Sequence, residues 1–122
     1  MSTLAVALTG NPNTGKSTIF NALTGARQKI GNWPGVTVDK KIGHTHYKGR
    51  AISIVDLPGT YSINARSPEE KIVIDYLTNT QLDLVLNVVD SSNIERNLFL
   101  TVQLLEKGIP LLIDLNMQDD AQ

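Results

Sequence analysis

The stretch GNPNTGKSTIFNALTG, residues 10–25, decides the fold of this 122-residue chain. Its first eight residues fit the pattern G-x-x-x-x-G-K-[ST], the phosphate-binding loop or P-loop. The apolar run LAVAL precedes it at residues 4–8, and Ile19, Phe20 and Leu23 follow at helical spacing. A buried strand, a glycine-rich loop and a helix are the context that a P-loop requires. The alternative, a glycine-rich turn before a helix, fits this context less well.

The residue types within the loop match the chemistry of phosphate binding. Small residues such as Gly10 and Gly15 let backbone N–H groups converge on a phosphate, and the positive end of the helix points the same way. We expect Lys16 to neutralise charge on the β- and γ-phosphates and the Ser17 hydroxyl to bind Mg²⁺. The residues expected to contact the nucleotide in this loop are Gly10, Asn11, Asn13, Thr14, Gly15, Lys16, Ser17 and Thr18.

A second motif, DLPG, follows the predicted strand at residues 51–55. Asp56 is placed to hold the Mg²⁺ shell, and the Gly59 N–H is placed to reach the γ-phosphate. Alone the pattern D-x-x-G is weak, since aspartate and glycine are common in turns. Its distance from the P-loop makes the pair of motifs a strong indication of a P-loop NTPase.

A third motif, NMQD at residues 116–119, follows the last predicted strand. The Asp119 carboxylate is suited to accept the paired N–H groups of a guanine edge, a pattern that adenine lacks. Asn116 and Asp119 therefore favour GTP over ATP, and the polarizable side chain of Met117 is suited to cover the base. The alternative is that these residues form a surface turn.

The remaining sequence alternates strands with helices. An exposed strand is expected at residues 39–49, and apolar strands at 82–90 and 109–116. A helix capped by Ser67 is expected to run to about Leu77, and residues 93–108 predict an amphipathic helix. The apolar stripe of that second helix is formed by Leu98, Val102 and Leu105. This order predicts a three-layer α/β fold of the P-loop NTPase type, with a mainly parallel sheet and helices on both faces.

The only tryptophan, Trp33, lies in the segment KIGNWPGVTVDKK at residues 29–41, which we expect to be irregular because it holds Gly31, Pro34 and Gly35. Its position between the P-loop helix and the DLPG strand is that of switch I in a GTPase. Thr37 is then the hydroxyl best placed to bind the metal. The Trp33 side chain is expected to anchor the loop in one state and to swing out in the other. The alternative is a fixed hydrophobic plug under a static loop.

Composition excludes several classes. With 41% hydrophobic and 19% charged residues the chain is globular, and its net charge of −1 does not favour a nucleic-acid partner. It has no cysteine, no apolar run that would span a membrane, and no basic leader before its first apolar run. His44 and His46 share one face of a strand, but without a nearby acid they indicate an exposed surface more than a metal site.

The motifs together resemble the N-terminal G domain of the FeoB family of ferrous-iron transporters. Besides the P-loop, the segments GNWPGVTVDKK, DLPGTYSI, NVVDSSNIERNLFLTVQLLEKGIP and LNMQD carry the resemblance. It implies a GTP-binding, GTP-hydrolysing regulatory domain on the cytoplasmic face of the bacterial inner membrane. The implied ligands are GTP or GDP with Mg²⁺, and the implied partner is the membrane-embedded transport domain of the same parent protein. Under this resemblance Lys16, Asn13, Thr37 and Gly59 are the catalytic residues, and Ser17, Thr37 and Asp56 hold Mg²⁺.

Two departures qualify these expectations. Thr60 and Tyr61 follow the D-x-x-G motif where many GTPases carry a water-orienting glutamine, so hydrolysis is expected to be slow and to use K⁺ held by Asn13. A complete G domain also continues beyond Asp119, so residues 1–122 are expected to form a partial G domain whose C-terminal strand and helices are missing, and activity is expected of the complete domain. Two alternatives remain open: a ribosome- or tRNA-associated GTPase, and an interaction module that no longer hydrolyses nucleotide.

Overall fold

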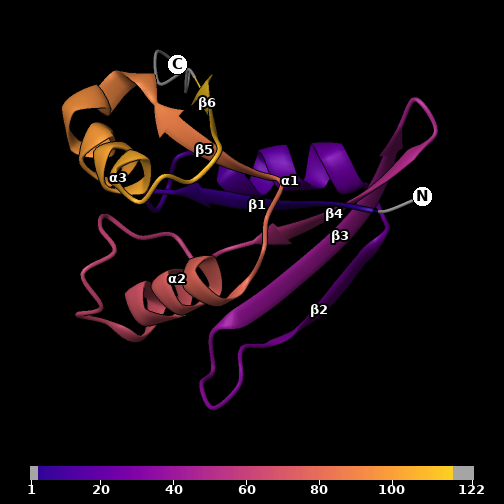
Figure 1. The fold of residues 1–122 in the computed structure, drawn as a ribbon, viewed down its shortest axis with the longest axis horizontal. Helices are drawn as coiled ribbons and strands as arrows, with labels where there is room; N and C mark the ends of the chain where they lie inside the picture. The colour runs from indigo at the N-terminus through magenta and orange to yellow at the C-terminus, as the bar shows by residue number, and fades with distance from the viewer. Residues whose placement is uncertain (1–2, 117–122) are drawn as a thin grey trace.

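A six-stranded sheet forms the centre of the molecule in the computed structural model, which describes residues 3–116 (Figure 1). The strand order across the sheet is β2-β3-β4-β1-β5-β6. Strands β1, β4, β5 and β6 are parallel neighbours, whereas β2 and β3 pair antiparallel at one edge. The strands are β1 (Leu4–Gly10), β2 (Gln28–Asn32), β3 (Asp39–Tyr47), β4 (Arg50–Asp56), β5 (Leu84–Asp90) and β6 (Leu111–Asn116).

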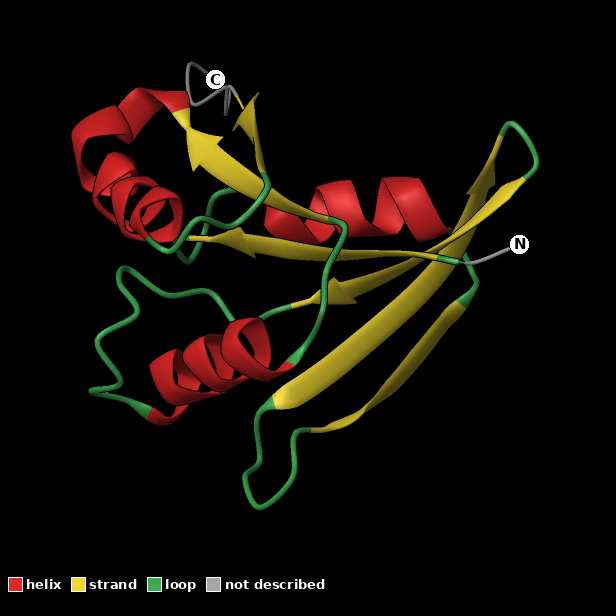
Figure 2. Cartoon of the chain, in the orientation of Figure 1, coloured by secondary structure: helices red, strands yellow, loops and turns green. Residues whose placement is uncertain are grey.

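Helices cover both faces of the sheet, which confirms the predicted α/β class (Figure 2). Helix α1 (Lys16–Thr24) packs its Phe20 on one face, where Leu8, Ile54 and Val88 form a core cluster. Helices α2 (Pro68–Asn79) and α3 (Ile94–Glu106) lie on the other face, and a short 3-10 helix, η1 (Ser91–Asn93), leads into α3. Because side chains alternate along a strand, neighbouring residues such as Ala7 and Leu8 enter opposite clusters.

Strand β2 corrects the expectation that the segment at residues 29–41 is irregular. Gln28–Asn32 pairs with β3 in an antiparallel hairpin, with Gly31 opposite Lys40 and Asn32 opposite Asp39. The strand lies at the sheet edge and four of its five side chains are exposed, so it carries no hydrophobic pattern that would reveal it. The strand forms because it pairs with β3 through backbone hydrogen bonds, which its own residue pattern does not predict.

The start of α2 forms as predicted. The Ser67 side chain accepts a hydrogen bond from the Glu70 N–H at 3.1 Å, Pro68 occupies the first helical position, and Glu69 and Glu70 lie in the first turn. A hydroxyl cap and early acidic residues both stabilise the positive end of a helix. The helix ends at Asn79, two residues beyond the predicted end at Leu77.

Helix α3 buries a different face from its apolar stripe. Leu98, Val102 and Leu105 are 38%, 50% and 54% exposed, whereas the buried residues of the helix are Asn97, Leu100, Thr101 and Leu104. Two of the four are polar and are satisfied internally: the Asn97 Oδ1 accepts the Asp90 N–H, and the Asn87 side chain donates to Thr101 Oγ1. The hydrophobic pattern misidentified the face because half of the buried positions are hydrogen-bonded polar residues.

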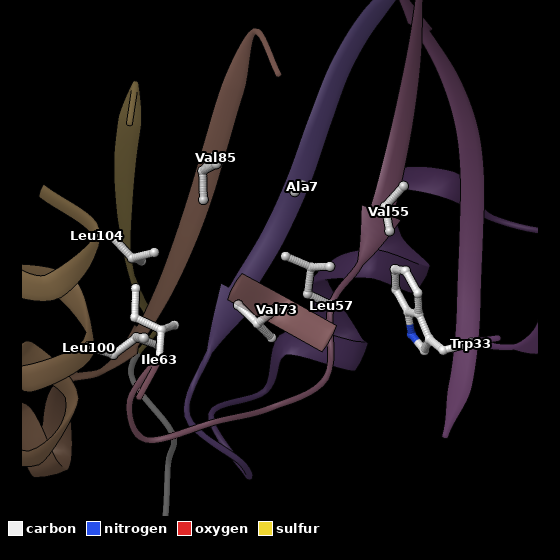
Figure 3. Close-up of a cluster of buried hydrophobic side chains, with 9 residues drawn as sticks. All are labelled: Ala7, Trp33, Val55, Leu57, Ile63, Val73, Val85, Leu100 and Leu104. Atoms are coloured by element: carbon white, nitrogen blue, oxygen red, sulfur yellow. The ribbon is translucent and has the colours of Figure 1, made fainter. Parts of the chain in front are cut away.

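Trp33 is a core residue in this structure, and it holds the loop between β2 and β3 against the sheet. It is 6% exposed and packs in the cluster that includes Val55, Leu57 and Val73 (Figure 3). Its ring meets Tyr76 of α2 edge-on, with centroids 5.5 Å apart, and burial raises the pKa of the Tyr76 hydroxyl. The Lys40 ammonium lies 4.7 Å from the indole centroid. This burial is expected both of a loop anchored in one state and of a fixed hydrophobic plug.

Candidate functional site

The carboxyl ends of the parallel strands meet at one edge of the sheet, where ligands bind in open α/β sheets. The P-loop leaves the end of β1 there and opens a cavity of about 370 Å³. Its lining is Asn11, Pro12, Asn13, Gly15, Lys16, Ser17 and Gly59. Residues 46 positions apart in sequence, Asn13 and Gly59, therefore face the same space.

Two left-handed residues shape the loop. Asn13 has φ of 66° and Gly15 has φ of 86°, and Gly15 directly precedes α1. Asparagine is among the few residues with a side chain that tolerate this region, and glycine enters it without strain. The turn they create leads the backbone around the cavity and sets the N-terminus of α1 beneath it, which is the geometry of an anion site.

Hydrogen bonds fasten the loop from within and from β6. The Thr14 hydroxyl donates to the Asn11 carbonyl at 3.1 Å, and Thr14 is 2% exposed. The Asn116 side-chain amide donates to the Thr14 carbonyl at 2.6 Å, across 102 residues of sequence. The P-loop and the start of the NMQD motif are thus adjacent, as the sequence reading requires.

Lys16, which lines the cavity, forms an ion pair with Asp56. Their side chains are 11% and 8% exposed, so both charges are largely removed from water. A buried charge is costly without a partner, and each residue supplies the counter-charge of the other. The pair places the ammonium from the P-loop and the carboxylate from the end of β4 at one point.

The DLPG segment is bound tightly to the P-loop. The Leu57 N–H donates to the Leu8 carbonyl and the Thr60 N–H donates to the Gly10 carbonyl, both at 3.0 Å. A Cβ at Gly59 would lie 3.0 Å from the Pro12 Cα, so a side chain there would press directly on backbone. Glycine is therefore required by the close approach of the two segments.

Comparison of the sequence with known families shows to which family the chain belongs. The family model described as "Ferrous iron transport protein B" matches residues 4–122. The chain belongs to the FeoB family. The Fe(2+) transporter FeoB of Shigella flexneri is 52% identical over the whole chain, and that of Escherichia coli K12 is 51% identical. The chain spans about 16% of the length of each of these relatives.

Solved FeoB structures share the fold. The G domain of Thermotoga maritima FeoB is 49% identical with a TM-score of 0.86, over 92% of this chain and 70% of that one. The cytosolic domain of Legionella pneumophila FeoB is 48% identical with a TM-score of 0.86, over 91% of this chain and 44% of that one. The N11A mutant of S. thermophilus NFeoB bound to mGDP is 53% identical with a TM-score of 0.87, over 93% of this chain and 44% of that one.

Not every predicted site residue of this FeoB chain lies at the cavity. Thr37 is exposed in the loop between β2 and β3, and it is not among the cavity-lining residues. Thr18 is exposed on α1 and also lies outside the lining. Met117 and Asp119 lie outside the described residues. Within residues 3–116, no group of three or more His, Cys, Asp or Glu side chains is gathered as a metal site, so His44 and His46 stand as exposed strand residues.

The loop between β2 and β3 is closed around Thr37. The Trp33 N–H donates to the Val38 carbonyl at 2.9 Å, and the Val36 N–H donates to the Trp33 carbonyl at 3.2 Å. Trp33 itself is held in the core. Thr37 cannot leave this loop for the P-loop cavity unless these bonds open or the whole loop moves.

Sequence reasoning missed the contribution of α3 to the site. A second cavity of about 170 Å³ adjoins the P-loop and is lined by Asn11, Pro12, Asn13, Thr14, Tyr61, Asp90, Asn93, Arg96 and Asn97. Arg96 is exposed, and its guanidinium lies over the Tyr61 ring at 4.2 Å from the centroid. No motif marks this contact, because it joins segments 35 residues apart. Among residues 3–116, no helix is both long and apolar enough to cross a bilayer.

Proposed function

We propose that this chain is part of a GTP-binding and GTP-hydrolysing regulatory domain of a bacterial ferrous-iron transporter. The observation that carries the proposal is the P-loop cavity, in which Lys16 and Ser17 face Gly59 of the DLPG segment. The arrangement suits a nucleoside triphosphate, because the Lys16 ammonium and the N-terminus of α1 meet where phosphates would lie. FeoB relatives described as bound to GDP support a guanine nucleotide.

The donor set fits Mg²⁺. Ser17 lines the cavity, and the Asp56 carboxylate is paired with Lys16, which also lines it. Hard oxygen ligands of this kind are those that Mg²⁺ prefers. When bound, the ion neutralises phosphate charge. Lys16 would pair with the phosphates in place of Asp56, and the Asp56 carboxylate would then help to hold the metal. Thr37 joins this set only after the loop between β2 and β3 has moved.

Base recognition is assigned to Asn116, Met117 and Asp119. Asn116 supports this role indirectly, since its amide holds the Thr14 carbonyl and so fixes the P-loop beside the base site. Asp119 is proposed to accept the N–H groups of guanine, and Met117 to cover the base. Gly10, Asn11, Gly15 and Thr18 complete the proposed nucleotide contacts.

Hydrolysis is proposed to be slow and to depend on K⁺. Thr60 is 5% exposed and its N–H is bonded to the Gly10 carbonyl, so in this arrangement its side chain is not available to orient a water molecule. Asn13 faces the cavity, and its amide oxygen is suited to hold a monovalent cation beside the phosphates. The backbone carbonyls of Gly31 and Asn32 are proposed to complete the shell of this cation, and because both residues pair with β3 they reach it only when the loop has moved.

The proposed location is the cytoplasmic face of the inner membrane, with the membrane-embedded transport domain of the same parent protein as partner and no nucleic acid. The relatives are named transporters, and this chain matches their N-terminal part. Net charge of −1 gives no electrostatic reason for binding RNA. The ribosome-associated alternative therefore has no support in the described residues.

Titration calorimetry with the full-length protein tests the proposal. GTP is expected to bind with Mg²⁺ and ATP to bind at least tenfold more weakly, and Lys16→Ala is expected to abolish tight GTP binding because it removes the charge facing the phosphates. Lys107→Ala, an exposed lysine after α3, is the matched control. GTP affinity that is unchanged in Lys16→Ala would refute the P-loop assignment. A rate of iron uptake into proteoliposomes that is the same with and without GTP would refute the regulatory role.

A further inference from the structure

The loop that joins β4 to α2, residues 57–67, is held by α3 at two places. Arg96 and Gln103 are seven residues apart, which is close to two helical turns, so both lie on one face of the helix. Arg96 contacts Tyr61, and Gln103 contacts Ile63 and Asn64. We name this pair of contacts the α3 clamp.

Gln103 uses both ends of its amide in the clamp. Its Oε1 accepts the Ile63 backbone N–H at 2.9 Å, and its Nε2 donates to the Asn64 Oδ1 at 3.0 Å. Ile63 is 5% exposed and belongs to the core cluster with Leu100 and Leu104 (Figure 3). The Ile63 N–H is therefore satisfied by a side chain in place of water, and its loss would leave a poorly hydrated donor.

Arg96 joins the same loop to the P-loop. Its guanidinium lies over the Tyr61 ring at 4.2 Å, and its backbone carbonyl accepts a hydrogen bond from the Asn11 side chain at 3.4 Å. The helix end that carries Arg96 is itself fixed, because Asn97 accepts from the Asp90 N–H and donates to the Asn93 carbonyl. These two hydrogen bonds hold the backbone next to Arg96 in place, so the position of Arg96 relative to Tyr61 is fixed.

The clamp lies next to the residues that reach the cavity. Gly59 lines the cavity against Pro12, and Thr60 is bonded to the Gly10 carbonyl. Tyr61 is two residues after Gly59, and Ile63 is four residues after it. A displacement of Tyr61 or Ile63 is therefore expected to shift Gly59 through the backbone. Glu70 of α2 holds the other end of the loop, through Ser62 and the Arg66 N–H.

We propose that Arg96 and Gln103 are positioning residues for GTP hydrolysis, which keep Gly59 at the P-loop cavity by holding residues 61–64 on α3. The inference rests on the proposed GTPase function. Because Gly59 is assigned to the γ-phosphate, which GDP lacks, loosening the clamp lowers the hydrolysis rate and leaves GDP affinity unchanged. Two neutral hydrogen bonds and one exposed cation–π contact set the scale, about tenfold for Gln103 and about threefold for Arg96.

The test is single-turnover GTP hydrolysis by the full-length protein carrying Gln103→Leu, Arg96→Leu or Glu95→Gln. Glu95 is the matched control, an exposed residue beside Arg96 on α3. The first two variants are expected to slow hydrolysis about tenfold and threefold, with GDP affinity within twofold of wild type. Gln103→Glu keeps the acceptor for Ile63 and is expected to recover part of the rate. Asn64→Ala added to Gln103→Leu is expected to cost less than the product of the two single effects.

A second readout separates this inference from the proposed function. Arg66 is exposed within the loop, so cleavage by trypsin after Arg66 reports how often the loop leaves α3. Cleavage is expected to be faster in Gln103→Leu than in Glu95→Gln. Wild-type protein that hydrolyses no GTP would refute the proposed function. Wild-type hydrolysis together with unchanged rates and unchanged cleavage in Gln103→Leu would overturn the clamp, as would an equal loss of GDP affinity.

Discussion

Replacing Trp33 by alanine should destabilise the protein and also favour GTP over GDP. The wild-type side chain is 6% exposed, meets Tyr76 edge-on and lies beneath the Lys40 ammonium. The loop that it anchors encloses Thr37, which lies outside the P-loop cavity. If Thr37 reaches the metal only after Trp33 has left the core, any loss of Trp33 packing weakens the state without GTP more than the state with it.

The magnitude follows from burial. Truncating a buried aromatic residue to alanine costs about 3–5 kcal/mol. Part of this is returned, because the Trp33 Nε1–H is buried with no hydrogen-bond partner, and such a donor costs about 1–3 kcal/mol. The net loss of stability is expected to be about 2–3 kcal/mol, which corresponds to about a 30- to 150-fold gain in affinity for a GTP analogue relative to GDP.

Two measurements on the full-length protein check this. Urea unfolding followed by circular dichroism gives the stability, and calorimetry gives affinities for GDP and a non-hydrolysable GTP analogue. Trp33→Phe is the control: it keeps an aromatic ring against Tyr76 and removes the unpartnered N–H, so both quantities should change by less than about 1 kcal/mol. A large loss of stability in Trp33→Ala with an unchanged ratio of affinities would show that Trp33 is a static plug and refute the reasoning.

Two further changes probe the base site and the fold. Asp119→Asn should weaken GTP binding and improve binding of xanthosine triphosphate, because the new amide donates where the carboxylate accepted; calorimetry that finds both affinities unaltered would remove Asp119 from base recognition. Ser67→Ala should lower the unfolding free energy by about 1 kcal/mol, since the Glu70 N–H loses its cap, and an unaltered urea midpoint would contradict that role.

The sequence predicted what local patterns control. The P-loop, its strand and its helix, and the cap of α2 by Ser67 depend on residues within a few positions of one another. The order of strands and helices then limited the fold to a few parallel α/β arrangements. The parallel order of β1, β4, β5 and β6 follows from these units.

Contacts between distant segments could not be predicted in the same way. Strand β2 exists because β3 pairs with it, and its exposed side chains carry no pattern of their own. The buried face of α3 was obscured because Asn97 and Thr101 are satisfied by partners on η1 and β5 that sequence spacing does not reveal. The packing of Trp33 could not be predicted for a related reason: the glycine and proline beside it describe the loop backbone and do not say where its ring packs.

Single-turnover hydrolysis of GTP by the full-length protein, in matched KCl and NaCl, tests the central claim most directly. Wild type is expected to hydrolyse GTP faster in KCl, and Asn13→Ala is expected to lose that difference because it removes the amide oxygen facing the cavity. Lys16→Ala is expected to show no hydrolysis in either salt. Hydrolysis that persists in Lys16→Ala would contradict the assignment of the P-loop cavity as the catalytic site, and equal wild-type rates in the two salts would contradict the role of Asn13.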